Sequence, residues 1–328
     1  MGNVLDTFRL LWFAISILLL PLVARSAQWT QGIGAKGGIV NSIVIAPWNC
    51  DTLFAATFDG LLLSADGGER WKGFGEGLEG HHLRVLAADA ADIGTLYIGT
   101  YNGGIFRSTD KGRTWAPVGQ SLSGSDIRSI LIDPQDHRVL YVGSFGGGVA
   151  QSTDQGESWT DISAGLPLKE VSALALIPGK QKALLAGVWT KGLFKYSLSQ
   201  KQWDPCAKSL AIEAITCLAV DPRKPETVYV GTYGGGVYVT ENGGETCSQR
   251  NKGLTNLYIK SLAVDSSSTV YAATDGGGVF KSLDGGESWI ADNDGLEHKY
   301  DYCITVSADA LKAVFVGTCW GGIYRKIK

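Results

Sequence analysis

The sequence has 328 residues, of which 45% are hydrophobic and 19% are charged, with a formal net charge of −3. This apolar content is enough for a complete hydrophobic core, and the length suits one large domain or two ordinary ones. The slight negative charge argues against general binding of nucleic acid, which needs a basic surface.

Residues 1–26 differ in character from the rest of the chain. Arg9 precedes an apolar run over residues 10–24, and the small residues Ala24 and Ser26 follow at its end. This order is typical of a signal peptide. The run is shorter than the roughly 20 residues that span a bilayer comfortably, and an uncleaved membrane anchor is the alternative. In both cases we expect the folded part outside the cytoplasm, in a periplasmic, extracellular or lumenal compartment.

Tryptophans recur at a nearly constant interval through the rest of the chain. The spacing is 44 residues in the middle of the series and 42 at its two ends, with one cysteine in the series; the positions are Trp29, Trp71, Trp115, Trp159, Trp203, Cys247 and Trp289. A repeat of this length is typical of a solenoid or a propeller. One unit, residues 126–166, contains four short runs rich in Val, Ile, Leu and Tyr, separated by turn residues. These runs predict four antiparallel strands, the content of one propeller blade.

We therefore predict an all-β fold, a single seven-bladed β-propeller over residues 27–328 with no second domain. The last unit, residues 301–328, contains only three strand-like runs. The missing fourth strand is expected around Trp29. The N-terminal strand would then complete the last blade and close the ring, which leaves no open sheet edge.

Four units carry the motif Ser-x-Asp-x-Gly-x-x-Trp between the third and fourth strands. The Asp and Ser side chains can accept hydrogen bonds from the turn, the Gly can take a positive φ, and the Trp can pack on the neighbouring sheet. The motif resembles the Asp-box, or bacterial neuraminidase repeat. Because two further copies, TENGGETC and SLSQKQW, are incomplete, we expect a structural and not a catalytic role. The complete copies contain Ser64, Asp66, Gly68 and Trp71; Ser108, Asp110, Gly112 and Trp115; Ser152, Asp154, Gly156 and Trp159; and Ser282, Asp284, Gly286 and Trp289.

The opposite face of the propeller is expected to carry the functional residues. Glycine-rich hairpins join the second and third strands there, and nearly every hairpin has an aromatic side chain suited to contact with a partner protein or a sugar. The alternative is that these rings only pack between blades. They are Phe58, Tyr101, Phe145, Trp189, Tyr233 and, shifted by one position, Trp320.

The first strand of each unit begins on the same face, near the central channel. Three of the seven equivalent residues are basic, which predicts a local positive patch at the channel mouth; the alternative is that these charges are simply solvated. The seven are Asn41, Arg84, Arg128, Ser172, Thr216, Lys260 and Tyr302, and His81 and His82 precede Arg84.

Six cysteines are irregularly spaced, without a Cys-x-x-Cys motif, and suggest neither a zinc site nor a redox motif. Cys303 and Cys319 lie on neighbouring predicted strands and are candidates for a local disulfide. The histidines are too scattered to indicate a metal site, and no cofactor motif is present.

Over all seven units, the chain resembles the photosystem II stability and assembly factor family in its signal-like start, its GTxxGG[IV][FY] hairpins, its boxes and its ring closure. The resemblance implies a monomeric, non-enzymatic exported scaffold that holds a membrane-associated protein complex, often through a basic patch on one face. Arg84, Arg128 and Lys260 stand where such a patch would form, although no run of several arginines is present.

Two other functions remain open from the sequence. The aromatic rim would also suit a carbohydrate- or ligand-binding propeller. A glycoside hydrolase of the sialidase or xyloglucanase type is disfavoured, because no Arg-Ile-Pro motif occurs and hydrolysis needs two carboxylates that flank one bond. Asp275 partly matches the xyloglucanase hairpin motif. Asp59 is a poor choice for the second catalytic carboxylate, because it lies two blades away.

Overall fold

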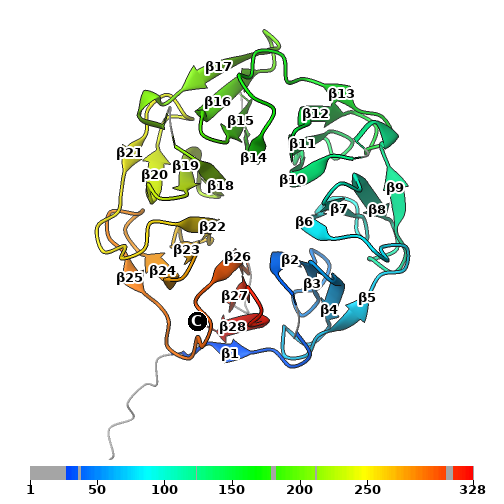
Figure 1. The fold of residues 1–328 in the computed structure, drawn as a ribbon, viewed down its shortest axis with the longest axis vertical. Helices are drawn as coiled ribbons and strands as arrows, with labels where there is room; N and C mark the ends of the chain where they lie inside the picture. Colours follow the sequence, from blue (N-terminus) through cyan, green and yellow to red (C-terminus); the bar gives the residue numbers. More distant parts are fainter. Residues whose placement is uncertain are drawn as a thin grey trace, which may run out of the picture.

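The computed structural model describes residues 27–35, 38–122, 124–178, 182–210, 213–307 and 313–327. In these residues, 28 strands form seven four-stranded antiparallel sheets, which stand as blades around a central channel (Figure 1). The predicted seven-bladed propeller is confirmed. Residues 1–26, and with them the predicted signal peptide, lie outside the described residues.

The first strand of each blade lines the channel (Figure 1). These strands are β2 (Val40–Ile45), β6 (Leu83–Ala88), β10 (Asp126–Ile132), β14 (Val171–Ile177), β18 (Ile215–Asp221), β22 (Ile259–Val264) and β26 (Asp301–Val306). The second strands are buried along almost all of their length, because neighbouring blades cover both faces of each sheet; this explains their continuous apolar sequence. They are β3 (Leu53–Thr57), β7 (Leu96–Thr100), β11 (Leu140–Phe145), β15 (Ala183–Val188), β19 (Lys224–Thr232), β23 (Val270–Thr274) and β27 (Ala313–Thr318).

The third and fourth strands form the outer part of each blade. The third strands are β4 (Gly60–Ser64), β8 (Ile105–Ser108), β12 (Gly148–Ser152), β16 (Gly192–Ser197), β20 (Val237–Thr240), β24 (Gly278–Ser282) and β28 (Ile323–Ile327). The fourth strands are β5 (Lys72–Phe74), β9 (Ala116–Val118), β13 (Thr160–Asp161), β17 (Gln202–Cys206), β21 (Ser248–Gln249), β25 (Ile290–Ala291) and β1 (Thr30–Gln31). Two short 3₁₀ helices, η1 (Gln120–Leu122) and η2 (Lys208–Leu210), follow β9 and β17.

The ring closes as predicted. The last sheet has the order β1-β28-β27-β26, and Thr30 pairs with Arg325 while Gln31 pairs with Tyr324. Trp29, just before β1, is buried, and its ring N–H donates to the carbonyl of Asp292 in the preceding blade at 2.5 Å. The chain therefore joins its two ends non-covalently.

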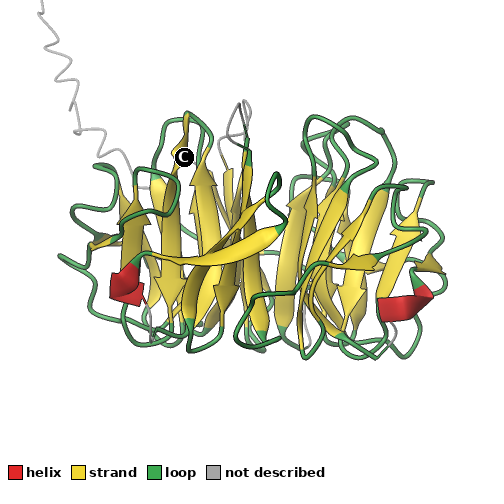
Figure 2. Cartoon of the chain, turned by 90° about the horizontal axis from the view of Figure 1, so that it is seen from above, coloured by secondary structure: helices red, strands yellow, loops and turns green. Residues whose placement is uncertain are grey.

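The two faces of the ring differ in what they carry. The hairpins between second and third strands, and the starts of the first strands, lie on one face, which we call the mouth face. The box turns between third and fourth strands lie on the other, which we call the turn face. Because β28 runs toward the turn face and β1 is antiparallel to it, both ends of the described chain lie there; Figure 2 shows the C-terminus at that edge of the ring.

The repeated box forms one hydrogen-bonded turn in each of its four complete copies. In blade two, the Ser108 hydroxyl donates to Asp110 Oδ1 at 2.8 Å and accepts the N–H of Gly112 at 2.9 Å. Asp110 Oδ1 also accepts the N–H of Thr114 at 2.9 Å, and the Trp115 ring N–H donates to the Gly112 carbonyl. The box glycines all have positive φ; they are Gly68, Gly112, Gly156 and Gly286. In blade two every box side chain is thus engaged in the turn itself, whereas the Trp289 ring N–H of the last copy donates to the Arg250 carbonyl.

The incomplete copy in blade five keeps this geometry. Thr240 and Asn242 replace Ser and Asp, and the N–H groups of Gly244 and Thr246 still donate to them at 2.9 and 3.0 Å. The geometry of the turn therefore requires acceptor oxygens at these positions and forms without a formal charge.

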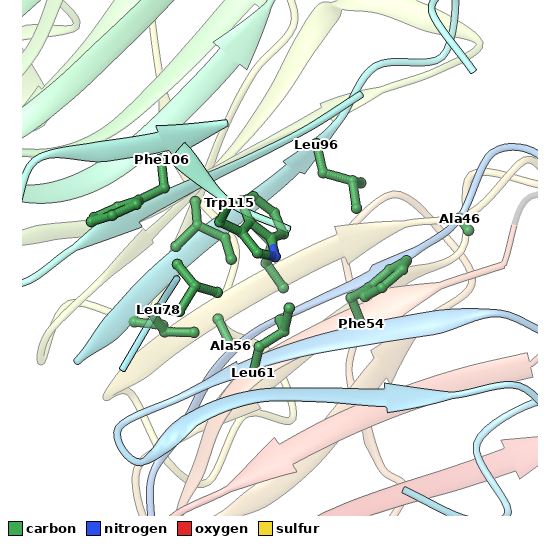
Figure 3. Close-up of a cluster of buried hydrophobic side chains, with 11 residues drawn as sticks. Ala46, Phe54, Ala56, Leu61, Leu78, Leu96, Phe106 and Trp115 are labelled. Carbon is green, nitrogen blue, oxygen red and sulfur yellow. The ribbon is translucent and has the colours of Figure 1, made fainter. Parts of the chain in front are cut away.

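The core consists of apolar clusters between adjacent blades. In the cluster between blades one and two, Trp115 lies among Phe54, Leu61 and Leu78 (Figure 3). Each box tryptophan thus connects the turn of its own blade to the sheet of the preceding one.

Candidate functional site

A cavity of about 720 Å³ opens at the mouth of the central channel. All seven residues predicted from the starts of the first strands line it. They are Asn41, Arg84, Arg128, Ser172, Thr216, Lys260 and Tyr302. The propeller symmetry brings together residues that are about 44 positions apart in the sequence, and the site is therefore a property of the closed ring.

The small polar residues of this set connect adjacent blades. The Ser172 hydroxyl lies 2.6 Å from the carbonyl of Ile215, and the Thr216 hydroxyl lies 2.7 Å from that of Ile259. Asn41 Nδ2 donates to the carbonyl of Leu83 at 2.8 Å. These contacts satisfy polar groups within the ring, so the longer side chains of the other blades are left to define the chemistry of the cavity.

Arg84 and Arg128 share one carboxylate. Arg84 Nε lies 3.2 Å from Asp126 Oδ1, and Arg128 binds the other oxygen of Asp126 at 2.6 Å. The guanidinium of Arg84 lies over the Tyr101 ring at 5.0 Å, and that of Arg128 lies over Phe145 at 4.9 Å. Each cation is thus held between a carboxylate and an aromatic face.

This pair retains a net positive charge. Two guanidinium groups face one carboxylate, and Asp126 is almost fully buried. Burial lowers the pKa of Arg84 from its usual value, and the neighbouring positive charge of Arg128 adds a smaller lowering. The negative charge of Asp126 opposes both. A bound anion would oppose this lowering of the pKa, because it would supply the second negative charge.

Lys260 is the third predicted cation, and its charge is balanced. Its Nζ lies 3.3 Å from Asp275 Oδ2 and about 5 Å from the rings of Tyr233 and Tyr302. The Tyr233 hydroxyl donates to Asp275 at 3.2 Å, and the charge of Asp275 raises the pKa of Tyr233. The positive patch predicted for the mouth is therefore concentrated at Arg84 and Arg128.

Three of the six predicted aromatic residues, together with Tyr258, form an arc over part of the rim. Ring centroids are separated by 6.0 Å for Phe145 and Trp189, 6.5 Å for Trp189 and Tyr233, and 4.9 Å for Tyr233 and Tyr258. Tyr258 was not predicted, since it lies outside the repeated hairpin motif.

Beyond the arc, the mouth face of blades six and seven exposes further rings. Tyr300 is 60% exposed and Trp320 is 71% exposed. The sequence analysis did not predict Tyr300 either. Like Tyr258, it stands immediately before the first residue of a first strand, and this shared position could be recognised by aligning the repeats. Cys319, and not Trp320, occupies the position of the other hairpin aromatics, because it pairs with Ile39 of the next blade.

The two predicted histidines lie beside the cavity, packed on other rings. His82 stacks on Phe58 with a centroid distance of 3.7 Å, and its Nδ1 lies 2.8 Å from the Phe58 carbonyl. His81 lies 4.7 Å from the ring of Phe106. Neither histidine is among the lining residues of the cavity.

The candidate disulfide between Cys303 and Cys319 is not formed in the structure, and the strand register explains why. A bulge between Asp301 and Cys303 places Cys303 opposite Gly317. The Cys303 thiol donates to the carbonyl of Val40 at 3.4 Å, while Cys319 lies beside Tyr302. The two thiols have different neighbours.

Asp301 is an unusual residue at the edge of the site. It is fully buried, and neither of its carboxylate oxygens has a hydrogen-bond partner among the described residues. At the equivalent position the other six first strands bury an aliphatic residue: Val40, Leu83, Ile127, Val171, Ile215 and Ile259. Burial raises the pKa of Asp301 to about 8, so the carboxyl group keeps its proton at neutral pH.

Metal-binding clusters and membrane-spanning helices are two structural features that bear on function. Within the part of the chain that the structure describes, no group of three or more His, Cys, Asp or Glu side chains is arranged to hold a metal ion. The same residues include no helix with the length and apolar content needed to cross a bilayer.

No protein-family model and no curated protein matches the chain. Solved structures do match it. YCF48 bound to D1 peptide aligns with a TM-score of 0.68 and 16% identity, over 92% of this chain and 96% of that one. These similarities show the fold. At such low identity they do not assign a function.

Two larger proteins contain a comparable propeller. The extracellular domain of the putative hybrid two-component system BT3049 from B. thetaiotaomicron aligns with a TM-score of 0.74 and 19% identity, over 92% of this chain but 42% of that one. A GH74 xyloglucanase from Xanthomonas campestris aligns with a TM-score of 0.70 and 17% identity, over 91% of this chain and 53% of the enzyme. The fold thus occurs in binding proteins, sensors and an enzyme.

Proposed function

We propose that this chain is an exported, non-enzymatic scaffold that helps to assemble or stabilise a membrane-associated protein complex. The mouth face is its binding surface, and Arg84 and Arg128 are the central contacts. The observation that carries the proposal is the sharing of Asp126 by these two arginines, inside a cavity rimmed by aromatic rings. A partner carboxylate, from an acidic side chain or a chain end, would complete this ion cluster.

Four observations support this function. The sequence of residues 1–26 has the order of a signal peptide. The aromatic and arginine residues of the mouth are the types that dominate protein interfaces. YCF48, which has the same fold over nearly the whole length of both chains, is described as bound to a peptide of D1. Asp275, the partial match to a glycosidase motif, is instead engaged by Lys260 and Tyr233.

The proposal is tested by affinity purification from the native membrane with variants of the arginine pair. We expect Arg84→Gln/Arg128→Gln to reduce recovery of the partner complex at least tenfold, and Arg84→Glu/Arg128→Glu to abolish it, because the second pair reverses both charges. Thermal unfolding of each variant establishes that the ring is intact.

Arg70→Glu/Arg113→Glu is the matched control. Both arginines are exposed, and they lie in two consecutive box turns on the turn face. The control carries the same change in net charge and should retain the partner. Equal recovery with the mouth variants and the control would refute the assignment of the arginine pair.

A second candidate function is carbohydrate binding by the rim of blades five to seven. The specific observation is the group of exposed rings, Tyr258, Tyr300 and Trp320, near the Asp275–Lys260 ion pair. Flat exposed rings can stack on sugar faces, and the carboxylate can accept hydroxyl hydrogen bonds. A glycan array distinguishes the two functions: sugar binding that Tyr258→Ser/Tyr300→Ser removes, and Arg84→Gln/Arg128→Gln retains, would favour this second candidate.

A further inference from the structure

Tryptophan fills the same position at six of the seven interfaces between blades. Each ring packs against the preceding blade. Its neighbour there is the residue three positions after the tryptophan or cysteine that the preceding blade contributes to the same repeat position. The Trp203 ring N–H donates to the carbonyl of Ile162 at 2.6 Å, and the Trp289 ring N–H donates to that of Arg250 at 2.9 Å. The Trp159 ring N–H donates instead to the Gly156 carbonyl of its own turn at 2.9 Å, and Trp159 packs with Val118 against the same apolar cluster. These contacts are the regular connection between neighbouring blades.

The interface between blades four and five departs from this rule on both sides. Cys247 replaces the tryptophan of blade five, and the residue opposite it, three positions after Trp203, is Cys206. Both cysteines pack against the apolar cluster that joins the two blades. A second cysteine therefore stands where the other blades have Gly, Phe, Val or Ile, or a charged residue.

The thiol of Cys206 lies against the box turn that ends in Cys247, close enough for the two thiols to interact electrostatically. A methyl group placed on Gly244, three residues before Cys247, would lie 3.3 Å from Cys206 Sγ. At the interface of blades two and three, a methyl group on Gly156 would lie 3.4 Å from Val118 Cγ2. Cys206 therefore takes the place of Val118, directly below the box turn that ends in Cys247.

We propose that Cys206 and Cys247 form a disulfide bond that joins blades four and five in place of the missing tryptophan contact. The structure shows the dithiol form, since all six cysteines are thiols. Formation of the bond removes one hydrogen from each thiol, and the two protons and two electrons pass to a disulfide donor, such as oxidised glutathione or a thiol–disulfide oxidase of the exported compartment. In the cell, the bond requires the export proposed above.

The chemistry of the site indicates when the bond forms. Burial, with a smaller contribution from the Cys247 thiol, raises the pKa of Cys206 to about 12, and burial raises that of Cys247 to about 12. The reactive thiolate is therefore scarce in the folded ring. We expect the bond to close during folding, before the interface excludes solvent.

The experiment refolds the full chain in a mixture of reduced and oxidised glutathione, then denatures it and alkylates the remaining thiols. We expect mass spectrometry to find a peptide that joins Cys206 to Cys247, with the other four of the six cysteines alkylated. Alkylation of all six, or a bond that joins other cysteines, would overturn the proposal. Because refolding needs no export, this result is independent of the proposed function; the same peptide from the exported fraction of cells tests the bond in its compartment.

Thermal unfolding tests whether the bond replaces the tryptophan. Reduction should lower the Tm of the refolded protein by on the order of 5 °C, whereas Cys206→Ser/Cys247→Ser should not respond to reductant. Cys206→Val/Cys247→Trp recreates the contact of blades two and three, and should match the oxidised protein in either redox state. Cys319→Ser, which removes a cysteine elsewhere, should keep the full response to reductant. An unchanged Tm on reduction of a confirmed bond would exclude the stabilising role.

Discussion

Asp301 is the residue whose ionisation should most strongly control stability. Its pKa is about 8 in the folded ring, against an ordinary value of 3.8 for an aspartate. Below about pH 4 the group is protonated in both states. Between about pH 4 and pH 8 the unfolded chain loses the proton while the folded chain keeps it, so the free energy of unfolding falls as pH rises.

We therefore expect Asp301→Val, which restores the aliphatic residue of the other blades, to be more stable than the wild type by a margin that grows with pH. The growth should approach about 1.4 kcal/mol per pH unit between pH 5 and pH 7. Urea unfolding across this range measures it, with Asp301→Asn as the variant of similar shape. Parallel pH profiles for wild type and Asp301→Val would contradict the assignment.

The box aspartates should stabilise the fold through their turns. Asp110→Ala removes the acceptor for the Thr114 N–H and for the Ser108 and Thr114 hydroxyls. We expect a loss of about 1–3 kcal/mol in the free energy of unfolding. Asp204→Ala, at an exposed position of the blade that has no complete box, should change it by less than about 0.5 kcal/mol.

Acid should weaken these turns in a defined window. Hydrogen bonds from the Ser288 hydroxyl and backbone hold the pKa of Asp284 at about 2. Its stabilising effect is therefore complete above the unfolded value near 4, and is lost as pH falls through 2. Asp284→Asn should fold as the Asn242 turn does, and should lose less stability between pH 4 and pH 2 than the wild type, as followed by circular dichroism.

At the scale of the strand, β28 contributes Lys326 to a buried ion pair at the interface between the last two blades, where the ring closes. Lys326 Nζ lies 2.7 Å from Asp292 Oδ1, and both residues are at least 91% buried, while the more exposed Lys281 contacts the same oxygen at 3.4 Å. Lys326→Met leaves Asp292 with its weaker partner, and we expect a loss of about 3 kcal/mol in the free energy of unfolding. Lys281→Met is the control and should cost about 1 kcal/mol or less. Equal losses in the free energy of unfolding for the two variants would show that burial does not determine how much an ion pair to Asp292 contributes.

The repeat predicted the strands, the blade number and the lining of the mouth, because each of these follows from one pattern applied seven times. It did not predict what departs from the pattern. Asp126 of blade three balances part of the positive charge of Arg84 in blade two, and only the curvature of the ring brings the two side chains together. The bulge before Cys303 changes its partner, and a bulge leaves no clear signal in the spacing. Tyr258 and Tyr300 precede the strands that the motif marks.

For the whole molecule, closure makes the ring one cooperative unit. Trp29 holds the N-terminal strand against both the last blade and blade six. We expect Trp29→Ala to lower the free energy of unfolding of the entire ring by about 3–5 kcal/mol, with tryptophan fluorescence and circular dichroism following one common transition. Thr30→Ala, at an exposed position of the same strand, should have little effect. Separate transitions would show that blades unfold independently.

Both termini of the described chain emerge on the turn face, so any attachment made through them leaves the cavity opening unobstructed. A C-terminal affinity tag, a fused reporter or a surface-coupled linker would therefore orient every molecule of a preparation with its arginine pair toward the solution. Binding measured on such an oriented layer would report only on the mouth face. Coupling through side-chain amines, which are present on both faces, would mix the two orientations and weaken the binding signal.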